Sequence, residues 1–240
     1  MSVVLTAASE MYLKASTINV TAKPITFAAW VKSDTLTPYQ GIISLTDNSS
    51  EWLLIWLRGA AGDNYPAALE YATAWKRAIA SAAYTTDTWH HICGVFTSST
   101  SRTIYLDGAN SSENTESQNV NFNLFDQILI GTYRTVTAAY FSGKIAGCSI
   151  WNTGLSEAQI ISLAGGESPL NVASDNLVDF WPLISDRYSL INSNHLTAYN
   201  SPTYDTNDNP TTVFNFPQRN ITTTKRLVVA GNDEIWYEDI

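Results

Sequence analysis

The sequence predicts an all-β fold, a sandwich of two antiparallel sheets, on three observations. Short runs rich in aromatic and β-branched residues recur along the 240-residue chain, separated by clusters of Gly, Asn, Asp and Ser. Many of these runs are apolar on both alternations, which suits strands that are covered on both faces. A clear helical pattern occurs once, and strands without alternating helices favour a sandwich.

The strands are expected at 24–31, 40–46, 51–59, 67–75, 89–96, 102–108, 126–133, 140–151 and 177–183. In the run 52–57, alternate residues from Trp52 share one face and those from Leu53 share the other, and all are apolar. Both faces of this strand should therefore be covered. The core residues expected on two facing sheets are Trp30, Trp89, Ile104, Leu106, Ile145, Ile150, Trp151 and Trp181.

One short helix is expected near residues 156–164. Ser156 can cap its N-terminus, and Gln159, three residues later, completes a capping box. Leu155 and Ile160 occupy the two positions of a hydrophobic staple. Gly165 follows the last apolar residue and predicts the end of the helix.

The composition limits the classes of partner. Charged residues make up only 15% of the chain, the net charge is −9 and the pI is about 4.7, so no basic surface for nucleic acid is expected. The N-terminal run MSVVLTAASEMYLKAS has no basic region, long apolar stretch or cleavage site, so no signal peptide is expected. No run is long and apolar enough to predict a membrane-spanning helix.

The adjacent histidines in DTWHHICGVF raise the question of metal binding or acid–base catalysis. Successive side chains of a strand point to opposite faces, so His90 and His91 cannot converge on one metal ion. We expect one of them to face the core, bonded to a backbone group, and the other to face outward. His195 is expected to be a structural residue of a loop or strand entry.

The two cysteines, Cys93 and Cys148, both lie in apolar strand-like runs. Two buried free thiols are the favoured interpretation, and a single disulfide is the alternative. The sequence alone leaves this choice open.

A series of landmarks along the chain is more specific than any single residue. They are ITFAAWVKSD, TWHHICGVF, RTIYLDG, ILIG, FSGKIAGCSIWNTGLSEAQIISLAGG and LVDFWPL. In this order and spacing they resemble the laminin-G-like and pentraxin-like branch of the concanavalin A-like lectin/glucanase superfamily. The resemblance covers roughly Ala8 to Asp208 and implies one jelly-roll domain over residues 1–213. It also implies that a histidine at the position of His91 is not catalytic.

The β-glucanase branch of this superfamily carries the pattern E-x-D-x-x-E, which places a nucleophile and an acid/base on one face of a strand. Retaining hydrolysis needs these carboxylates about 5 Å apart. No such run occurs here, and the acidic candidates lie in turns or singly on strands: Asp47, Glu51, Glu70, Asp107, Asp126 and Asp179. The chain is therefore not expected to be an enzyme.

In the pentraxin-like branch an Asp-Asn pair ahead of a strand contributes to calcium binding, and TDNSSEWLLIW resembles that stretch. Asp47 and Asn48 are therefore candidate oxygen ligands, with an ordinary Asx turn as the alternative. The second ligand cluster of that branch falls at 132–134, where Thr, Tyr and Arg supply no carboxylate. We expect no cofactor beyond a single weak calcium ion. A pentraxin-like disulfide is not expected either, because the partner position of Cys93 falls near Ala28.

The candidates for glycan binding are Trp52, Trp56, Tyr71 and Trp75 on two successive strands, with Tyr65 in the loop between them. Aromatic rings can stack on the apolar faces of sugars and lose little rotamer freedom. The alternative is that Trp52 and Trp56 fill the core of the sandwich. Trp75, beside Lys76 and Arg77, is the strongest candidate for exposure.

Residues 214–240 differ from the rest of the chain. NFPQRNITTTK predicts a linker, and RLVVAGNDEIWYEDI predicts two strands around Gly231, Asn232 and Asp233. A lone hairpin is marginally stable in water, so we expect this one to act as an arm that docks on a neighbouring subunit or assembly. The residues expected to make that contact are Leu227, Val229, Ile235, Trp236 and Tyr237. The alternative is that the hairpin covers a sheet edge of its own domain.

These features favour a non-catalytic surface module of a larger particle. Phage virions often carry laminin-G-like domains, and the neutral surface, the tail and the expected lack of a signal peptide suit a protein of the virion surface. We expect a phage virion protein, decorating or tail-associated, that mediates adhesion to glycans or a host surface and is oligomeric or part of an assembly. A purely structural protein that cements a capsid is the alternative, and a glycoside hydrolase is the weakest one.

Overall fold

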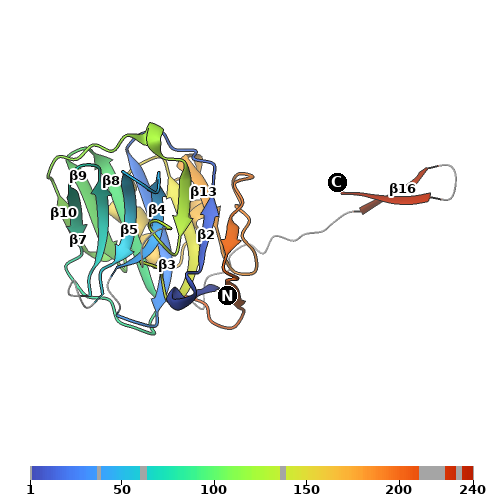
Figure 1. The fold of residues 1–240 in the computed structure, drawn as a ribbon, viewed down its shortest axis with the longest axis horizontal. Helices are drawn as coiled ribbons and strands as arrows, with labels where there is room; N and C mark the ends of the chain where they lie inside the picture. The colour runs from blue at the N-terminus through green and yellow to red at the C-terminus, as the bar shows by residue number, and fades with distance from the viewer. Residues whose placement is uncertain are drawn as a thin grey trace.

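The computed structural model describes residues 2–36, 39–59, 64–135 and 139–210, and the backbone of two further strands at 225–230 and 234–239. The main body is a sandwich of two sheets, and every strand pairing within them is antiparallel (Figure 1). The all-β sandwich that the sequence predicts is therefore confirmed.

Sheet A has eight strands. In spatial order they are β10 (Ala109–Asn114), β9 (Ser101–Leu106), β8 (His90–Ser98), β3 (Ile25–Ser33), β12 (Gly143–Trp151), β1 (Ser2–Leu5) and β15 (Thr203–Asp205), and β13 (Leu177–Trp181) also pairs with β12. Sheet B has seven strands. They are β14 (Thr197–Tyr199), β2 (Tyr12–Ala15), β11 (Gln127–Ile130), β4 (Gln40–Thr46), β5 (Trp52–Leu57), β6 (Pro66–Tyr71) and β7 (Trp75–Ile79).

The helix α1 (Glu157–Ala164) begins and ends where its capping residues predict. The Ser156 backbone N–H donates to Oε1 of Gln159 at 2.9 Å, and the Gln159 N–H donates back to the Ser156 hydroxyl at 3.4 Å. The helix buries Ile160 and Leu163 against the outer face of sheet A. Short 3-10 helices lie at Ala7–Ser9, Phe122–Leu124, Pro169–Asn171 and Ser174–Asn176.

Two apolar layers involve sheet A, one on each face. The main core lies between the sheets, and a second cluster lies between sheet A and the segment that contains α1. The expectation that the predicted core residues would be divided between two facing sheets is wrong, because all of them lie on or next to sheet A. Trp30 and Trp151 face the helix side, and Trp89 is only half-buried.

A buried ion-pair network joins the two sheets. Glu70 of β6 accepts a bond from Arg102 Nε of β9 at 3.1 Å and one from Lys23 Nζ at 2.6 Å. The side chains of Glu70 and Arg102 are fully buried. Burial lowers the pKa of Lys23, and the Glu70 carboxylate opposes that shift. Because a charge left unpaired inside a protein is costly, this network fixes how the two sheets lie against each other.

The histidines and cysteines have structural positions. His91 is buried and packs edge-on against Trp30, whereas the His90 ring contacts an oxygen of Asp107 at 2.8 Å. The two rings lie on opposite faces of β8, as expected. The expectation that one of them faces outward is wrong, because the His90 side chain is only 12% exposed. The bond to a backbone group is also made by His90, whose Nε2 accepts the Thr85 N–H at 3.1 Å, whereas Nδ1 of His91 has no hydrogen-bond partner. Cys93 and Cys148 are buried free thiols on opposite faces of sheet A, so the disulfide alternative is wrong.

The first prediction concerns the helix-side core. Trp151 is fully buried and its Nε1 donates to the Val172 carbonyl at 2.8 Å. Replacing Trp151 with Ala should lower the free energy of unfolding by roughly 3–5 kcal/mol, because it removes a large buried side chain and leaves a cavity. Urea denaturation measures this, and Leu124→Ala, at an exposed site, should change stability by less than about 0.5 kcal/mol. Wild-type stability in Trp151→Ala would contradict this packing.

The second prediction concerns the pH dependence of stability. Burial lowers the pKa of His91 to about 4, against the charge of Asp107, while the unfolded chain has a histidine pKa of about 6.5. The unfolded state therefore gains a proton first as the pH falls, and stability is lost between about pH 6.5 and pH 4. Between pH 7 and pH 5 this residue should contribute a loss of about 2 kcal/mol.

Denaturation of the wild type and of His91→Gln at both pH values measures that contribution as a difference. His91→Gln should lose less stability on acidification than the wild type does. Equal slopes for the wild type and His91→Gln would show that His91 is not held neutral.

Candidate functional site: an aromatic face on sheet B

The outer face of sheet B is apolar at its centre. The alternation of β5 places Trp52, Leu54 and Trp56 on this face, while Leu53, Ile55 and Leu57 lie in the core between the sheets. Trp52 and Trp56 therefore do not fill the space between the sheets. Each is still only 4% exposed, because other aromatic side chains cover it.

Four rings form a column, here called the aromatic ladder, which consists of Trp52, Trp75, Trp56 and Tyr39. The Trp75 ring lies parallel to Trp52, with centroids 5.7 Å apart and planes 7° apart, and parallel to Trp56 at 6.0 Å and 10°. Tyr39 stacks on Trp56 at 4.8 Å and 20°. The ladder joins β5, β7 and the segment ahead of β4, and it leaves Trp75 43% exposed.

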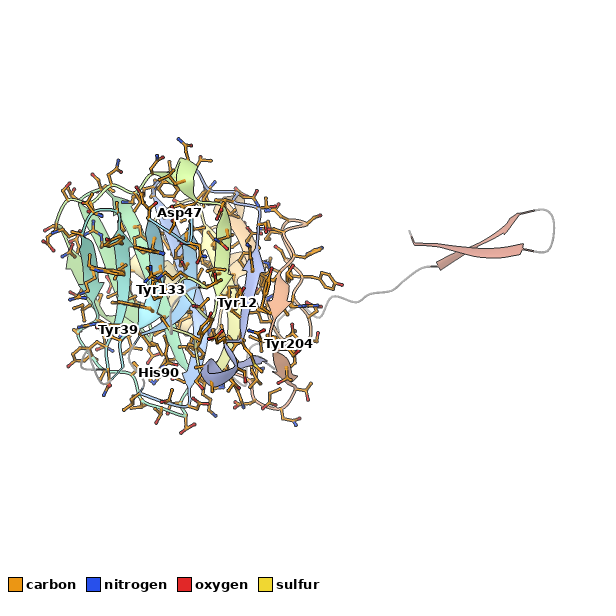
Figure 2. The ribbon with its side chains drawn as sticks, viewed as in Figure 1. Tyr12, Tyr39, Asp47, His90, Tyr133 and Tyr204 are labelled. Atoms are coloured by element: carbon orange, nitrogen blue, oxygen red, sulfur yellow. The ribbon has the colours of Figure 1, made fainter. Side chains whose placement is uncertain are left out.

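Tyr133 lies across the ladder. Its ring is inclined by 78° to 83° to the three indole planes, at centroid distances of 5.9 to 6.5 Å. Gly41 of β4 permits this position, since a Cβ at that residue would collide with the backbone of Thr132 and Tyr133. The neighbouring guanidinium of Arg134 lies 5.1 Å from the Trp52 ring centroid. Figure 2 shows Tyr39 and Tyr133 on the same part of the sandwich.

A groove runs beside this cluster and encloses about 340 Å³. It is lined by Tyr39, Trp56, Trp75, Arg77 and Tyr133. The Arg77 side chain is exposed and makes no ion pair or hydrogen bond with another described residue. The indole N–H groups of Trp52 and Trp56 are buried and lack a hydrogen-bond partner. The groove therefore combines ring surface with a free cationic donor, a combination that suits a small polar ligand with apolar faces.

The sequence-predicted aromatic residues have different positions in this site. Trp75 is exposed as expected, and Tyr71 packs against both Trp52 and Trp75 at centroid distances of 4.5 and 4.6 Å. Tyr65 is half-buried ahead of β6 and is not among the lining residues of the groove. Sequence reasoning missed Tyr39, Arg77 and Tyr133 as lining residues. The sequence could have indicated Arg77, because this residue follows Trp75 by two positions on the same strand and therefore lies on the same face.

The Asp47-Asn48 pair forms a turn that satisfies its own oxygens. One carboxylate oxygen of Asp47 accepts the backbone N–H groups of Ser49, Ser50 and Glu51 at 2.8 to 3.0 Å, and the other accepts the hydroxyls of the two serines. Burial raises the pKa of Asp47, but these hydrogen bonds outweigh it and hold the pKa well below its usual range. The Asn48 amide exchanges two hydrogen bonds with Thr135. This is the Asx-turn geometry.

The remaining carboxylates are mostly engaged in structural contacts. Glu70 is paired as described above, Glu51 accepts the backbone N–H of Asn121, and Asp179 accepts bonds from Ser189 and Asn194. Within the described ranges, no three His, Cys, Asp or Glu residues cluster closely enough to hold a metal ion. None of the described helices is long and apolar enough to cross a membrane.

Several solved structures share this fold. One is domain 4 of AbnA, an extracellular arabinanase from Geobacillus stearothermophilus, which was solved with arabinotriose. It aligns with a TM-score of 0.54 and 18% identity, and the alignment covers 61% of this chain and 68% of the arabinanase domain. A heptameric pentraxin from Limulus polyphemus aligns with a TM-score of 0.56 and 13% identity, and the alignment covers 84% of this chain and 93% of the pentraxin. Tailspike protein 2 of the Escherichia coli O157:H7 bacteriophage CAB120 aligns with a TM-score of 0.54 and 15% identity. That alignment covers 75% of this chain and 26% of the tailspike. At these identities the similarity shows the fold alone.

No curated protein matches the chain significantly. Residues 7–161 match the Laminin_G_3 family, which is described as belonging to the concanavalin A-like lectin/glucanases superfamily. The match includes the strands that form the aromatic ladder and extends into α1. The resemblance that the sequence landmarks indicate is confirmed. This chain therefore belongs to the concanavalin A-like lectin/glucanase superfamily, in its laminin-G-like branch.

Proposed function

We propose that this protein is a non-catalytic carbohydrate-binding module and that the groove beside the aromatic ladder is its binding site. The observation that carries this proposal is Trp75, a tryptophan held in a fixed orientation by two parallel indoles and nevertheless 43% exposed. A large ring fixed in advance loses little entropy when it contacts a ligand. Sugars offer C–H faces to such rings and hydroxyl groups to neighbouring donors.

The polar groups of the groove complement its rings. Arg77 can donate to the hydroxyl and ring oxygens of a sugar, and the Tyr39 and Tyr133 rings give the groove aromatic walls. The volume of about 340 Å³ is at the lower end of the range for small-molecule sites. We therefore propose a ligand of one or a few sugar units, bound with modest affinity.

The structural neighbours are consistent with this class of ligand. The arabinanase domain was solved with an oligosaccharide, and the tailspike belongs to a phage particle. We propose that the present chain serves on a virion surface, decorating or tail-associated, where binding of glycans attaches the particle to a host. A purely structural, cementing role is the second candidate, and the C-terminal segment favours it.

The C-terminal hairpin supports an assembly role. Strand β16 (Lys225–Ala230) pairs with β17 (Glu234–Asp239) in a two-stranded sheet of its own, while the linker at 214–224 and the turn at 231–233 lie outside the described residues. Ahead of them the chain is fixed to sheet A, since Asp208 accepts bonds from Trp89 at 2.7 Å, Lys144 at 2.6 Å and Lys32 at 3.0 Å. We propose that residues 214–240 form a docking arm, with the side chains named above as its contact surface.

The third prediction tests the carbohydrate site. On a glycan array the wild type should give saturable signals, and Trp75→Ala should weaken the best ligand at least tenfold, about 1.4 kcal/mol, because the exposed ring is lost. Tyr199→Ala is the control. It removes a comparably exposed ring, which stacks on Tyr12 at the opposite edge of sheet B, and this variant should bind glycan as the wild type does.

The same measurement addresses calcium. Because the Asp47 oxygens are already used by their own turn, we propose at most one weak calcium site there, and chelator should leave both binding and the melting temperature unchanged. Absence of glycan binding in the wild type, together with retention in particles, would favour the cementing role.

The fourth prediction tests the arm. A chain truncated after Asn215 retains the Asp208 contacts and both complete sheets, so it should fold with the melting temperature of the full chain. It should no longer associate with its particle in co-sedimentation. Precipitation or unfolding of the truncated chain would show instead that the hairpin covers its own domain.

A further inference from the structure

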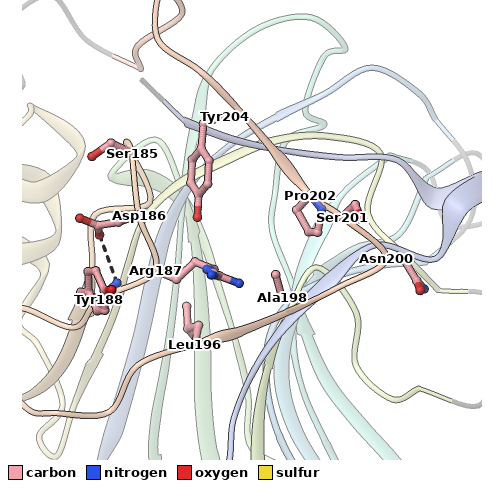
Figure 3. Close-up of a pocket in the computed structure, with 10 residues that line it drawn as sticks. All are labelled: Ser185, Asp186, Arg187, Tyr188, Leu196, Ala198, Asn200, Ser201, Pro202 and Tyr204. Carbon is pink, nitrogen blue, oxygen red and sulfur yellow. Dashed lines mark hydrogen bonds between the residues drawn. The ribbon is translucent and has the colours of Figure 1, made fainter.

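A second pocket lies at the open edge of the sandwich. It encloses about 520 Å³ between β14 and β15, which are the edge strands of sheets B and A (Figure 3). The turn between these strands and the segment 185–188 form its walls. Ala198 and Tyr204 line the pocket and also pack against the main core. The pocket is therefore the mouth of the space between the two layers, and it shares no residue with the aromatic groove.

Two hydrogen-bond donors face this pocket without a protein acceptor. The Tyr204 hydroxyl oxygen is buried and has no hydrogen-bond partner, and Figure 3 shows it directed toward Arg187. Burial raises the pKa of Tyr204 to about 12, although the Arg187 charge lowers it, so the hydroxyl stays protonated at neutral pH. A buried donor without a partner destabilises the protein, and a ligand that accepts from it would remove that cost.

The second donor, Arg187, keeps its charge available. Its side chain is exposed and, among the residues that the structure describes, receives no ion pair or hydrogen bond. Asp186 also lines the pocket, but it forms no ion pair with Arg187, and its Oδ1 accepts the backbone N–H of Tyr188 at 3.1 Å (Figure 3). On a chain with a net charge of −9, an unpaired arginine beside a buried hydroxyl marks a place where a negative group is stabilised.

The other walls select among negative groups. Leu196, Ala198 and Pro202 give an apolar surface, and Ser185 and Ser201 are the hydroxyl-bearing residues of the lining. The amide of Asn200 is already used, because its Nδ2 donates to the Glu10 carbonyl at 2.9 Å. A carboxylate has two oxygens, which match one arginine fork and one hydroxyl, whereas a phosphate carries more charge and more acceptors than these two donors satisfy. The polar rim suits a ligand that carries several hydroxyl groups.

From these features we propose that the edge pocket binds a carboxylate-bearing monosaccharide unit, a uronic acid, with its carboxylate on Arg187 and Tyr204. The site is independent of the aromatic groove, so an acidic glycan could contact the protein at two separate places. Its apolar face would lie against Leu196 and Pro202, and its hydroxyl groups would face the serine side chains of the lining.

The test is a titration of the full chain with D-glucuronate, D-glucose and inorganic phosphate, followed by NMR chemical shifts. Glucuronate should bind at least tenfold more tightly than glucose, which lacks the carboxylate, and more tightly than phosphate. Arg187→Gln should lower the glucuronate affinity at least tenfold. Tyr204→Phe keeps the ring and removes only the hydroxyl, and it should lower the affinity severalfold. Melting temperatures equal to that of the wild type establish that both variants fold.

Lys14→Gln is the matched control, because it removes one positive charge from β2 at a residue that lines neither pocket. It should leave the glucuronate affinity unchanged. Wild-type affinity in Arg187→Gln, equal affinity for phosphate or glucose, or an equal loss in Lys14→Gln would each overturn the proposed edge site. Failure of Trp75→Ala to change array binding bears on the groove alone.

Discussion

The constraint from which the functional surface follows is that β5 is apolar on both faces. In a two-layer sandwich each sheet buries one face against the other sheet and turns its second face toward water. The inner residues of β5 are covered by sheet A in this way, but Trp52, Leu54 and Trp56 need a second cover. Sheet B obtains it from Trp75, Tyr39 and the segment that carries Tyr133, because no described helix lies there.

The two sheets cover their apolar outer faces in different ways. The outer face of sheet A is covered by a capped helix and its following segments, which bury Trp151 completely. The outer face of sheet B is covered by side chains that come from separate strands and loops. These rings do not cover the face completely, and they leave the groove beside Trp75 and Arg77. The incomplete cover is the physical reason why this face, rather than the helix side, offers aromatic surface to a ligand.

Most charged side chains of the protein take part in ion pairs or hydrogen bonds that stabilise the fold, so the few without such partners are candidates for ligand binding. Glu70 and Arg102 are paired inside the sandwich, and Asp208 gathers two lysines and an indole at the end of the main body. The side chains of Arg77 and Arg187 have no such partner among the described residues, and each lines a pocket. In an acidic protein, such residues are where polar ligands with negative or electron-rich groups would be recognised.

The sequence by itself determined the elements whose information is local. The alternation of β5, the capping box of α1 and the opposite orientation of His90 and His91 follow from periods of two and 3.6 residues and from capping chemistry. The order of landmarks was sufficient to indicate the superfamily, and Trp75 could be singled out because charged residues follow it directly.

Only the tertiary structure decided which face of a strand meets which layer. Trp52 and Trp56 are apolar whether they face the other sheet or the outside, so their pattern cannot distinguish the two, and Trp30 and Trp151 had the same ambiguity. Tyr39 and Tyr133 join the site from segments far apart in the chain, and the edge pocket depends on where two sheets end. These features arise from long-range packing, which the local periodicity of a sequence does not encode.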